Sequence, residues 1–322
     1  MPGWCLSAML RFVLIRIGRA LLTLLLSSFL IFGALYLTPG TPLGFLVGGH
    51  TLSPADLAAL KQQYHLNDPF FQRYLLWLGD VLHGDFGQSI VFRESVSSLL
   101  APRIGSTLLL VAYAAILIIV LGIGLGVLSA TRPGRLDTSV TVGTTIGLAT
   151  PTFVMAIVLI SLFSVTLGWF PSLGSGSGFF DRVWHLTLPA IALAVSGLAY
   201  MTQTSRAALR AELGQEHVIT AQARGLPRGV ILRHHVLRNA AIPIATVGGV
   251  TVASLFAAVA VVEVAFGLQG IGSYLIQSVS DKDFAVVQAI SLILVTAFIV
   301  TNTIVDILYH VLDPRLRTRA QT

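Results

Sequence analysis

The residues of this chain that could take part in chemistry or recognition are concentrated in one basic stretch, from Arg206 to Arg238. Six of the 20 Lys and Arg residues lie there, opposed by Glu212 and Glu216. Gly225-Leu226-Pro227 divides the stretch, and glycine favours the end of a helix whereas proline favours the start of the next. Residues at helical spacing predict one helix on each side: Arg206, Leu209, Leu213, Val218 and Ala221 before, and Ile231, Leu232, Val236 and Leu237 after. The stretch therefore predicts two short helices that another protein could bind.

No catalytic or phosphate-binding motif is found in the sequence. The two lysines, Lys61 and Lys282, do not follow a glycine-rich phosphate loop, so the chain has no Walker A motif of its own. Cys5 is the single cysteine, which excludes an internal disulfide and a cysteine-based metal site. The adjacent His234 and His235 could bind a metal ion, but a solvated or partner-facing pair is the favoured interpretation. We therefore predict a non-catalytic chain that binds no metal or cofactor itself, with its energy source on another chain.

The composition is typical of a membrane protein. Hydrophobic residues make up 55% of the sequence, charged residues 11%, and the mean hydropathy is +0.84. Six segments lack Asp, Glu, Lys and Arg, and each contains at least about 18 largely apolar residues, enough for a membrane span: 20–55, 104–131, 138–180, 183–205, 239–262 and 284–305. Because 138–180 is too long for one span, a helix to about Gly168 and then an interfacial loop are expected. We predict an all-α polytopic membrane protein with six transmembrane helices.

The positive residues predict the orientation of these spans. With an inside N-terminus, 14 of the 20 Lys and Arg residues lie on the cytoplasmic side and six lie outside. The prediction is N-in and C-in, and the pI near 9.9 then reflects topology and not nucleic-acid binding. The first apolar run is long and lacks a small-residue cleavage site, so we expect an uncleaved first span, with Met9 as an alternative start.

The expected spans divide the chain into three parts: 1–37 with the first span, an extracytoplasmic segment 38–102, and a core 103–322 that contains the cytoplasmic loop 206–240. Within the external segment, Ser53-Pro54-Ala55-Asp56 predicts a helix start. A second amphipathic helix is expected over 69–82. Because long loops usually have a function, this segment is a candidate platform for an external partner, with Tyr74, Trp77 and Asp85 as docking residues. The alternative is a lid that packs on the helix ends.

Polar residues within the spans are mostly neutral. Hydroxyl and amide groups that could line a path for a polar solute are Thr144, Thr145 and Thr150 in the third span and Ser196 and Gln203 in the fourth. Such groups are equally common in helix packing, which is also the expected role of the glycines in 122–126. Glu263 and Asp306 fall near the ends of the last two spans and are expected to be hydrated. Since no acid or lysine falls at mid-membrane, a proton-coupled carrier has no obvious relay.

The stretch 220–243, TAQARGLPRGVILRHHVLRNAAIP, resembles the cytoplasmic "EAA" loop of ABC-importer permeases of the oligopeptide, dipeptide and nickel type. The matching positions are Ala221, Ala223, Gly225, His234, Arg238, Asn239 and Pro243. Ile219-Thr220-Ala221 replaces the general Glu-Ala-Ala, and Gly225 is farther from Pro243 than in sugar-type permeases. Both departures are usual for the peptide branch. The resemblance implies coupling helices that enter a groove on an ATPase, with contacts from Ala221, Ala223, Arg224, Gly225, Leu226, Arg228 and His234.

Further motifs follow in family order and cover most of the chain. Tyr74-Leu-Leu-Trp-Leu78 and Gly84-Asp-Phe-Gly-Gln-Ser89 resemble the external segment of the B-type subunit. Shorter matches are Ala149-Thr-Pro-Thr-Phe153, Leu188-Pro189, Val262-Glu-Val-Ala-Phe266, Gly270-Ile-Gly272 and Leu312-Asp-Pro-Arg315. They imply a type I ABC importer transmembrane domain in a bacterial inner membrane.

The resemblance also implies partners and a cargo. The partners are a homologous second permease in a heterodimer, two ATPase domains that bind ATP and Mg, and an extracytoplasmic substrate-binding protein. Peptides are the implied cargo, and glutathione, nickel chelates or another small solute are alternatives. A secondary carrier and a membrane-embedded scaffold are the competing classes of function.

Overall fold

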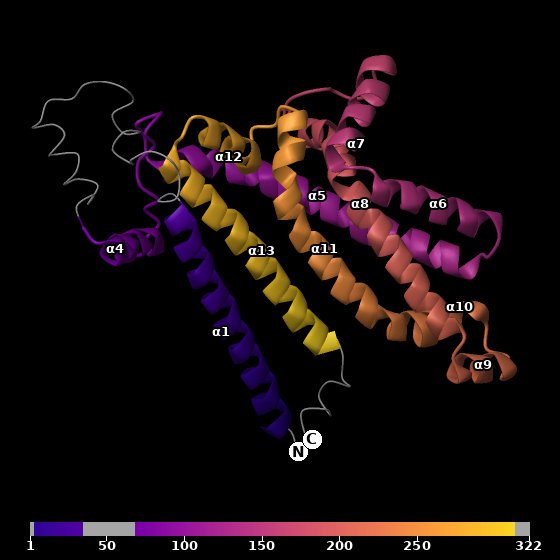
Figure 1. The fold of residues 1–322 in the computed structure, drawn as a ribbon. Helices are drawn as coiled ribbons and strands as arrows, with labels where there is room; N and C mark the ends of the chain where they lie inside the picture. Colours follow the sequence, from indigo (N-terminus) through magenta and orange to yellow (C-terminus); the bar gives the residue numbers. More distant parts are fainter. Residues whose placement is uncertain (1–2, 35–67, 313–322) are drawn as a thin grey trace, which may run out of the picture.

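The structure, a computed structural model, describes residues 3–34 and 68–312, and every regular element in these ranges is helical (Figure 1). The first part of the chain forms α1 (Gly3–Ala34), α4 (Phe70–Leu82), α5 (Val96–Thr131), α6 (Arg135–Ala149), α7 (Thr152–Leu159) and the π-helical η2 (Ile160–Thr166). The second part forms α8 (Phe179–Leu213), α9 (Glu216–Ala223), α10 (Arg228–Val230), the π-helical η3 (Ile231–Val236), α11 (Leu237–Ala265), α12 (Ile271–Ser280) and α13 (Phe284–Leu312).

The predicted membrane spans are present as long apolar helices. Five helical segments are long and apolar enough to cross a membrane: 11–34, 96–131, 179–213, 228–265 and 284–307. A bent helix pair raises the number to six if it counts as one span. The all-α, polytopic prediction is thereby confirmed, as is the amphipathic helix expected over 69–82, which is α4. The predicted helix start at Ser53 and the motif that follows Leu312 lie outside the described residues.

The third span differs from its prediction. The single helix expected up to about Gly168 is wrong, because α6 and α7–η2 meet at an angle of 110°. Thr150 at the junction has an extended backbone, with φ −88° and ψ 119°. Pro151 follows it, and the proline ring disfavours helical geometry at the preceding residue and supplies no N–H group. The Thr150-Pro151 pair therefore favours a bend at this point, although the hydropathy of the segment alone does not predict it.

The bundle is organised around α8, which packs against α5, α6 and α11, while α13 joins α11 to α1 (Figure 1). The α5–α8 contact is very close. A Cβ atom at Gly126 would lie 2.4 Å from the Cβ atom of Ser205, and one at Gly122 would lie 2.8 Å from that of Met201. Close helix packing at these two glycines is therefore confirmed, and α5 and α8 form one tightly packed unit.

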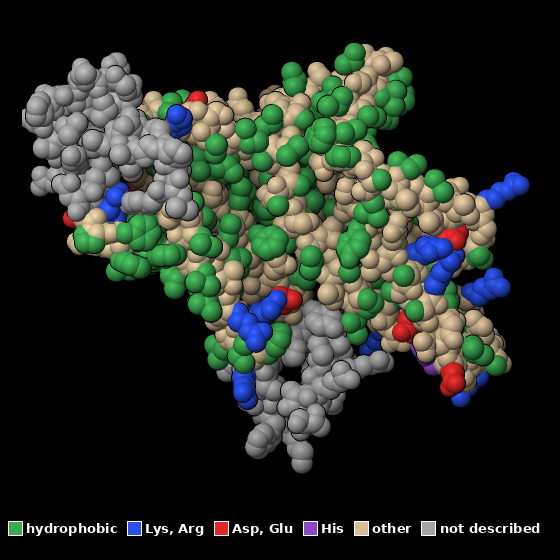
Figure 2. Space-filling view, in the orientation of Figure 1, with side chains coloured by type: hydrophobic (Ala, Val, Ile, Leu, Met, Phe, Trp, Pro, Cys, Tyr) green, Lys and Arg blue, Asp and Glu red, His purple; other side chains and the backbone are tan. Residues whose placement is uncertain are grey.

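The two ends of α11 carry different structures. The short helices α9 and α10 precede its first residue, and α12 follows its last (Figure 1). Lys and Arg side chains gather over the start of α6 and around α9 and α10, whereas apolar side chains cover much of the bundle (Figure 2). This asymmetry agrees with an N-in, C-in topology in which α9 and α10 face the cytoplasm.

Candidate functional site

The basic stretch is built from the end of one long helix, one short helix and the beginning of another long helix. The helix expected to run from Arg206 to Ala221 is interrupted, because α8 ends at Leu213 and α9 begins at Glu216. Gly214 ends α8, and Gln215 is extended with ψ 149°. The second expected helix is not separate either, since α10 and η3 lead directly into α11. α10 is thus continuous with the membrane-spanning α11 through η3, whereas α9 follows α8 after a two-residue break and is held by buried contacts of Val218 and Ala221 in the cluster that includes η3.

The turn between α9 and α10 has the geometry that Gly225-Leu226-Pro227 predicts. The N–H of Leu226 donates to the carbonyl of Ala221 at 3.2 Å, and the N–H of Gly225 donates to that of Gln222 at 2.9 Å. These two bonds form a Schellman motif, which requires a left-handed residue, and Gly225 has φ +72°. No atom lies within 4 Å of a Cβ placed at Gly225. Glycine is therefore needed for its backbone conformation and not for lack of space.

The side chains around this turn form an exposed tip. Ala223, Arg224, Leu226, Arg228 and His234 are exposed. Ala221 is buried in the core cluster that also contains Val218, Ile231 and Val236, so it anchors α9 instead of facing outward.

Two exposed apolar residues of this tip were not predicted from the sequence. Ile219 and Val230 are 56% and 40% exposed, beside Leu226 at 39%. An exposed apolar group rimmed by arginines is typical of a protein-binding surface. Their apolar character was visible in the sequence, but their exposure was not.

A polar contact joins the three helices at the base of the tip. The Asn239 amide on α11 donates to the Glu212 carboxylate on α8 at 3.3 Å, and His217 on α9 lies 3.5 Å from the same carboxylate oxygen. Within the described ranges, no group of three His, Cys, Asp or Glu side chains could hold a metal ion. The rings of His217 on α9 and His235 on η3 lie 6.4 Å apart between centroids, which adds a contact between these two elements.

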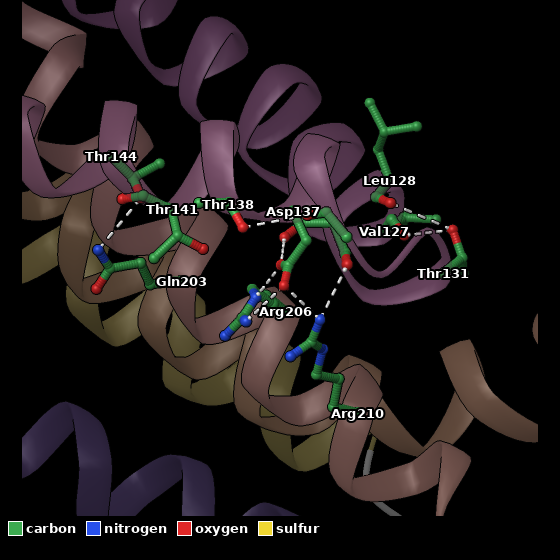
Figure 3. A network of polar contacts seen from close by, with 12 residues as sticks. Val127, Leu128, Thr131, Asp137, Thr138, Thr141, Thr144, Gln203, Arg206 and Arg210 are labelled. Carbon is green, nitrogen blue, oxygen red and sulfur yellow. Dashed lines mark hydrogen bonds and ion pairs between the residues drawn. The ribbon is translucent and has the colours of Figure 1, made fainter.

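A second polar cluster lies one helical turn before the end of α8 (Figure 3). Asp137, in the first turn of α6, accepts from Arg206 Nε at 2.6 Å and from Arg206 Nη2 at 3.0 Å. It also accepts from Arg210 at 2.7 Å and from the Ser129 hydroxyl at 2.5 Å. Asp137 was not predicted from the sequence, because its two arginine partners lie on α8, 69 and 73 residues farther along the chain.

The five residues expected to line a solute path divide into two groups. Gln203 donates to the Thr144 hydroxyl at 3.2 Å, and the Ser196 hydroxyl lies 3.5 Å from the carbonyl of Gly147, so these three lie between α6 and α8. Thr145 and Thr150 donate to carbonyls of their own helix.

A hollow of about 370 Å³ opens between these two helices and α5. Its lining is mostly apolar and includes Val140, Thr144, Val195 and Leu198. The packing between α6 and α8 is therefore incomplete, and polar contacts bridge the two helices beside the hollow.

The external docking residues also lie in different settings. Tyr74 is buried, because its ring packs edge-on against Phe29 at 5.3 Å and its hydroxyl lies 2.9 Å from the Ser28 hydroxyl. Tyr74 therefore fixes α4 on α1 and offers no exposed face to a partner. Trp77 and Asp85 line an open hollow of about 340 Å³, together with Arg73 and Gln288.

The GDFGQS motif is anchored by a buried acid near the start of α13. Ser89 donates to Asp283 Oδ2 at 2.5 Å, and Asp283 is 1% exposed. Gly84 and Gly87 have φ of +83° and +84°, which glycine adopts without strain. The motif therefore holds the segment before α5 against the turn that joins α12 to α13.

Glu263 was expected to be hydrated, but its side chain is buried, with 1% of the residue exposed. Its Oε1 accepts from the Thr107 hydroxyl at 2.5 Å and its Oε2 from the N–H of Ser273 at 2.9 Å. A Cβ at Gly270 would lie 2.0 Å from Oε1. The VEVAF and GIG motifs therefore act together. The buried Glu263 carboxylate of the first motif caps the first turn of α12, which begins in the second motif. Asp306, near the other face, pairs with Arg16 and joins α13 to α1.

Two family models match the chain. Residues 122–318 match the family described as "Binding-protein-dependent transport system inner membrane component", and residues 9–111 match its N-terminal companion. Together the two matches cover the spans, the α9–α10 tip and the Asp137 cluster.

Relatives match nearly the whole chain. An oligopeptide transport system permease protein, AppB of Bacillus subtilis (strain 168), is 38% identical over 92% of this chain and 95% of its own length. A dipeptide transport system permease protein, DppB of Escherichia coli (strain K12), is 33% identical over 96% of this chain and 99% of its own length.

Solved structures share the fold at lower identity. The MetNI methionine ABC transporter in an inward-facing conformation matches with a TM-score of 0.55 at 19% identity, over 67% of this chain and 96% of that chain. An amino acid ABC transporter crystallised with histidines gives a TM-score of 0.53 at 18% identity, over 66% of this chain. These likenesses support the type I ABC importer fold that the motifs imply.

Proposed function

The chain belongs to the family of binding-protein-dependent transport system inner membrane components, and from this premise we propose that it carries peptides into the cytoplasm as one of two membrane subunits of an ATP-driven importer. The observation that carries the proposal is the exposed tip formed by α9, the Gly225 turn and α10. It offers apolar and arginine side chains on α9, which packs against η3, and on α10, which continues through η3 into α11. Such a tip can take up a push from an ATPase and pass it to membrane-spanning helices.

The proposed complex has four kinds of component. This chain pairs with a homologous permease, and two ATP-binding-cassette domains that bind ATP and Mg dock on the two permeases from the cytoplasm. A substrate-binding protein delivers the cargo from outside. The arginines Arg224 and Arg228 pair with carboxylates of the ATPase, in preference to anionic lipid headgroups. ATPase closure then shifts the bundle between inward-open and outward-open states.

Peptide cargo is supported by relatives named as oligopeptide and dipeptide permeases, which match more than nine-tenths of this chain. Glutathione, nickel chelates and other small solutes are alternatives for the same architecture. For the path, we propose that Thr145 and Thr150 face the solute, while Thr144, Ser196 and Gln203 hold α6 to α8. On the outer side, Trp77 and Asp85 contact the binding protein, and the buried Tyr74 holds α4 on α1.

The settings of the acids weigh against a proton-coupled carrier. Glu263 is held by the first turn of α12 and by Thr107, and Asp137 is held by two arginines. Ionisable groups within membrane spans often mark proton relays, but they also pair with other groups for structural reasons. The contacts of both acids are accounted for by helix packing, so neither acid by itself points to a relay.

Mild-detergent purification of the tagged chain from its own host tests this function. We expect stoichiometric recovery of a second permease and of P-loop ATPases, with ATP hydrolysis in the eluate. The complex is then placed in liposomes with its binding protein, and uptake of a defined mixture of short synthetic peptides is measured by mass spectrometry. Recovery of a lone, monodisperse chain without ATPase activity would overturn the proposal in favour of a carrier or a scaffold.

A further inference from the structure

The Asp137 cluster joins three helices of the bundle, α5, α6 and α8. Arg206 and Arg210 lie one turn apart on the same face of α8, and both reach the single carboxylate of Asp137 (Figure 3). The Arg206 guanidinium binds through two nitrogens, which fixes its orientation as well as its distance. Arg210 also reaches the carbonyl of Ser129 at 3.4 Å, which adds the end of α5 to the cluster.

On one side, the cluster is adjacent to the coupling tip. α8 ends at Leu213, three residues after Arg210, and α9 begins at Glu216. Because α5 and α8 are in close contact at Gly126 and Ser205, a push on α9 moves this end of both helices together. Together with the three-residue connection 132–134 from α5, the cluster attaches the start of α6 to the moving unit.

On the other side, the cluster leads to the bend of the third span. Asp137 and Thr150 are at opposite ends of α6, and 13 residues correspond to roughly 20 Å of helix. Between them, the hollow of about 370 Å³ leaves apolar contact between α6 and α8 incomplete. The Gln203–Thr144 bond and a tight contact at Gly147 supplement the cluster farther along α6. Apolar packing alone therefore holds α6 to α8 poorly at its Asp137 end.

We propose that Asp137 is a positioning residue, which latches α6 to the end of α8 through Arg206 and Arg210 and so transmits movement of the coupling tip to the bend at Thr150-Pro151. This inference rests on the proposed function, since it concerns how ATP hydrolysis is converted into opening of the path. The latch predicts a specific defect. Without it, the ATPases still turn over, but the Asp137 end of α6 no longer follows α8 closely, and hydrolysis is uncoupled from uptake.

The test uses the complete transporter in liposomes with its binding protein and the peptide mixture. Asp137→Asn removes the charge but keeps an oxygen that can accept from Ser129. We expect peptide uptake per ATP hydrolysed to fall about tenfold, a typical coupling factor between two sites. The rate of ATP hydrolysis should stay within about twofold of the wild-type rate, which is a small change compared with such a coupling factor. Arg135→Gln is the matched control, because Arg135 is an exposed charge in the same first turn, and it should behave as the wild type.

A covalent substitute for the latch separates transmission from a merely structural role. A Cβ at Gly147 would lie 3.4 Å from the Cβ of Ala199, close to the separation in a disulfide, so Gly147→Cys with Ala199→Cys can tie α6 to α8. Cys5→Ser removes the native thiol. In the Asp137→Asn background, oxidation of this pair should restore coupled uptake, and reduction should abolish it again.

The outcomes distinguish the two proposals. A wild-type complex without ATP-driven peptide uptake overturns the proposed function, whatever the variants do. An active wild type with an equally coupled Asp137→Asn transporter overturns the latch alone. The latch is also overturned if Asp137→Asn lowers hydrolysis and uptake in parallel and the oxidised disulfide restores neither.

Discussion

Two carboxylates on opposite sides of the membrane, Glu263 and Asp137, are each held by several donors, but by different kinds of donor. Glu263 accepts from the backbone of α12 and from Thr107, and it is 1% exposed. Asp137 accepts from two arginine side chains and from Ser129, and its own side chain is 14% exposed. The external acid is thus held by fixed groups, and the cytoplasmic acid largely by long, half-exposed side chains.

The difference indicates different roles. Backbone N–H groups at a helix start cannot move without unfolding that helix, so Glu263 holds α12 in one position against α5. Arginine side chains join two separate helices and can follow both as they shift. We therefore expect substitutions at the external acid to change stability, and substitutions at the cytoplasmic acid to change coupling while the fold persists.

The largest expected effect is that of Glu263→Ala. It leaves the Thr107 hydroxyl and the first N–H groups of α12 without their acceptor, each at a cost of about 1–3 kcal/mol. We expect a large loss of thermal stability in detergent and little recovery of the complex. Glu263→Gln keeps an acceptor of the same shape, so it should lie between alanine and the wild type. Wild-type stability of Glu263→Ala would contradict the role of this acid as a helix cap.

Gly270→Ala should approach the same effect, because the added methyl group would lie 2.0 Å from Glu263 Oε1 and displace the carboxylate. A double-mutant cycle sharpens the comparison. If contact with the carboxylate is the reason for glycine, Gly270→Ala should cost much less in the Glu263→Ala background than alone. Equal costs in both backgrounds, measured as shifts of the unfolding temperature, would mean that a contact other than Glu263 rejects the methyl group, since Gly270 has an extended backbone with φ −104°.

The hydroxyls Thr107 and Ser129 allow a matched test of the two sites. Thr107 both donates to Glu263 and accepts from the N–H of Ile271 at 2.9 Å, so Thr107→Val breaks two buried bonds. Ser129→Ala removes one of the four side-chain bonds to Asp137 and leaves both arginines. We expect Thr107→Val to lower the free energy of unfolding by about 2 kcal/mol and Ser129→Ala by about 1 kcal/mol. The reverse order in thermal melts would break the comparison.

At Gly225, within the tip, we expect a modest effect on stability and a larger effect on function. Its φ of +72° is strained for a residue with a side chain, at about 1 kcal/mol, and more so for a β-branched one. Gly225→Val should leave membrane insertion intact but abolish ATPase stimulation by the loaded binding protein. Gly225→Asn, which tolerates this conformation, should keep most of it. Loss of stimulation in both variants to the same degree would indicate that bulk, and not backbone geometry, is what the ATPase rejects.

The sequence predicts the turn at Gly225 well because its signals are local. Gly225 and Pro227 encode a Schellman motif and a helix start within a few residues, and the structure has both. The contacts of the external segment were harder to predict from the sequence. Tyr74 lies on the expected helix, but its burial depends on the Ser28 and Phe29 side chains of α1, far away in the chain. Helical periodicity predicts that an aromatic side chain packs against another part of the protein, but not which part.

Hydropathy and turn chemistry, which act over short stretches of chain, allowed the sequence by itself to determine the apolar spans, the basic tip, the glycine packing of α5 and the resemblance to importer permeases. The tertiary structure alone decided which partners the acids have and how the third span bends in space. A carboxylate is inexpensive inside a membrane protein only when donors from other helices reach it, and those donors are brought together by helix packing. Asp137 and Glu263 therefore became interpretable only once α6, α8, α11 and α12 were in place.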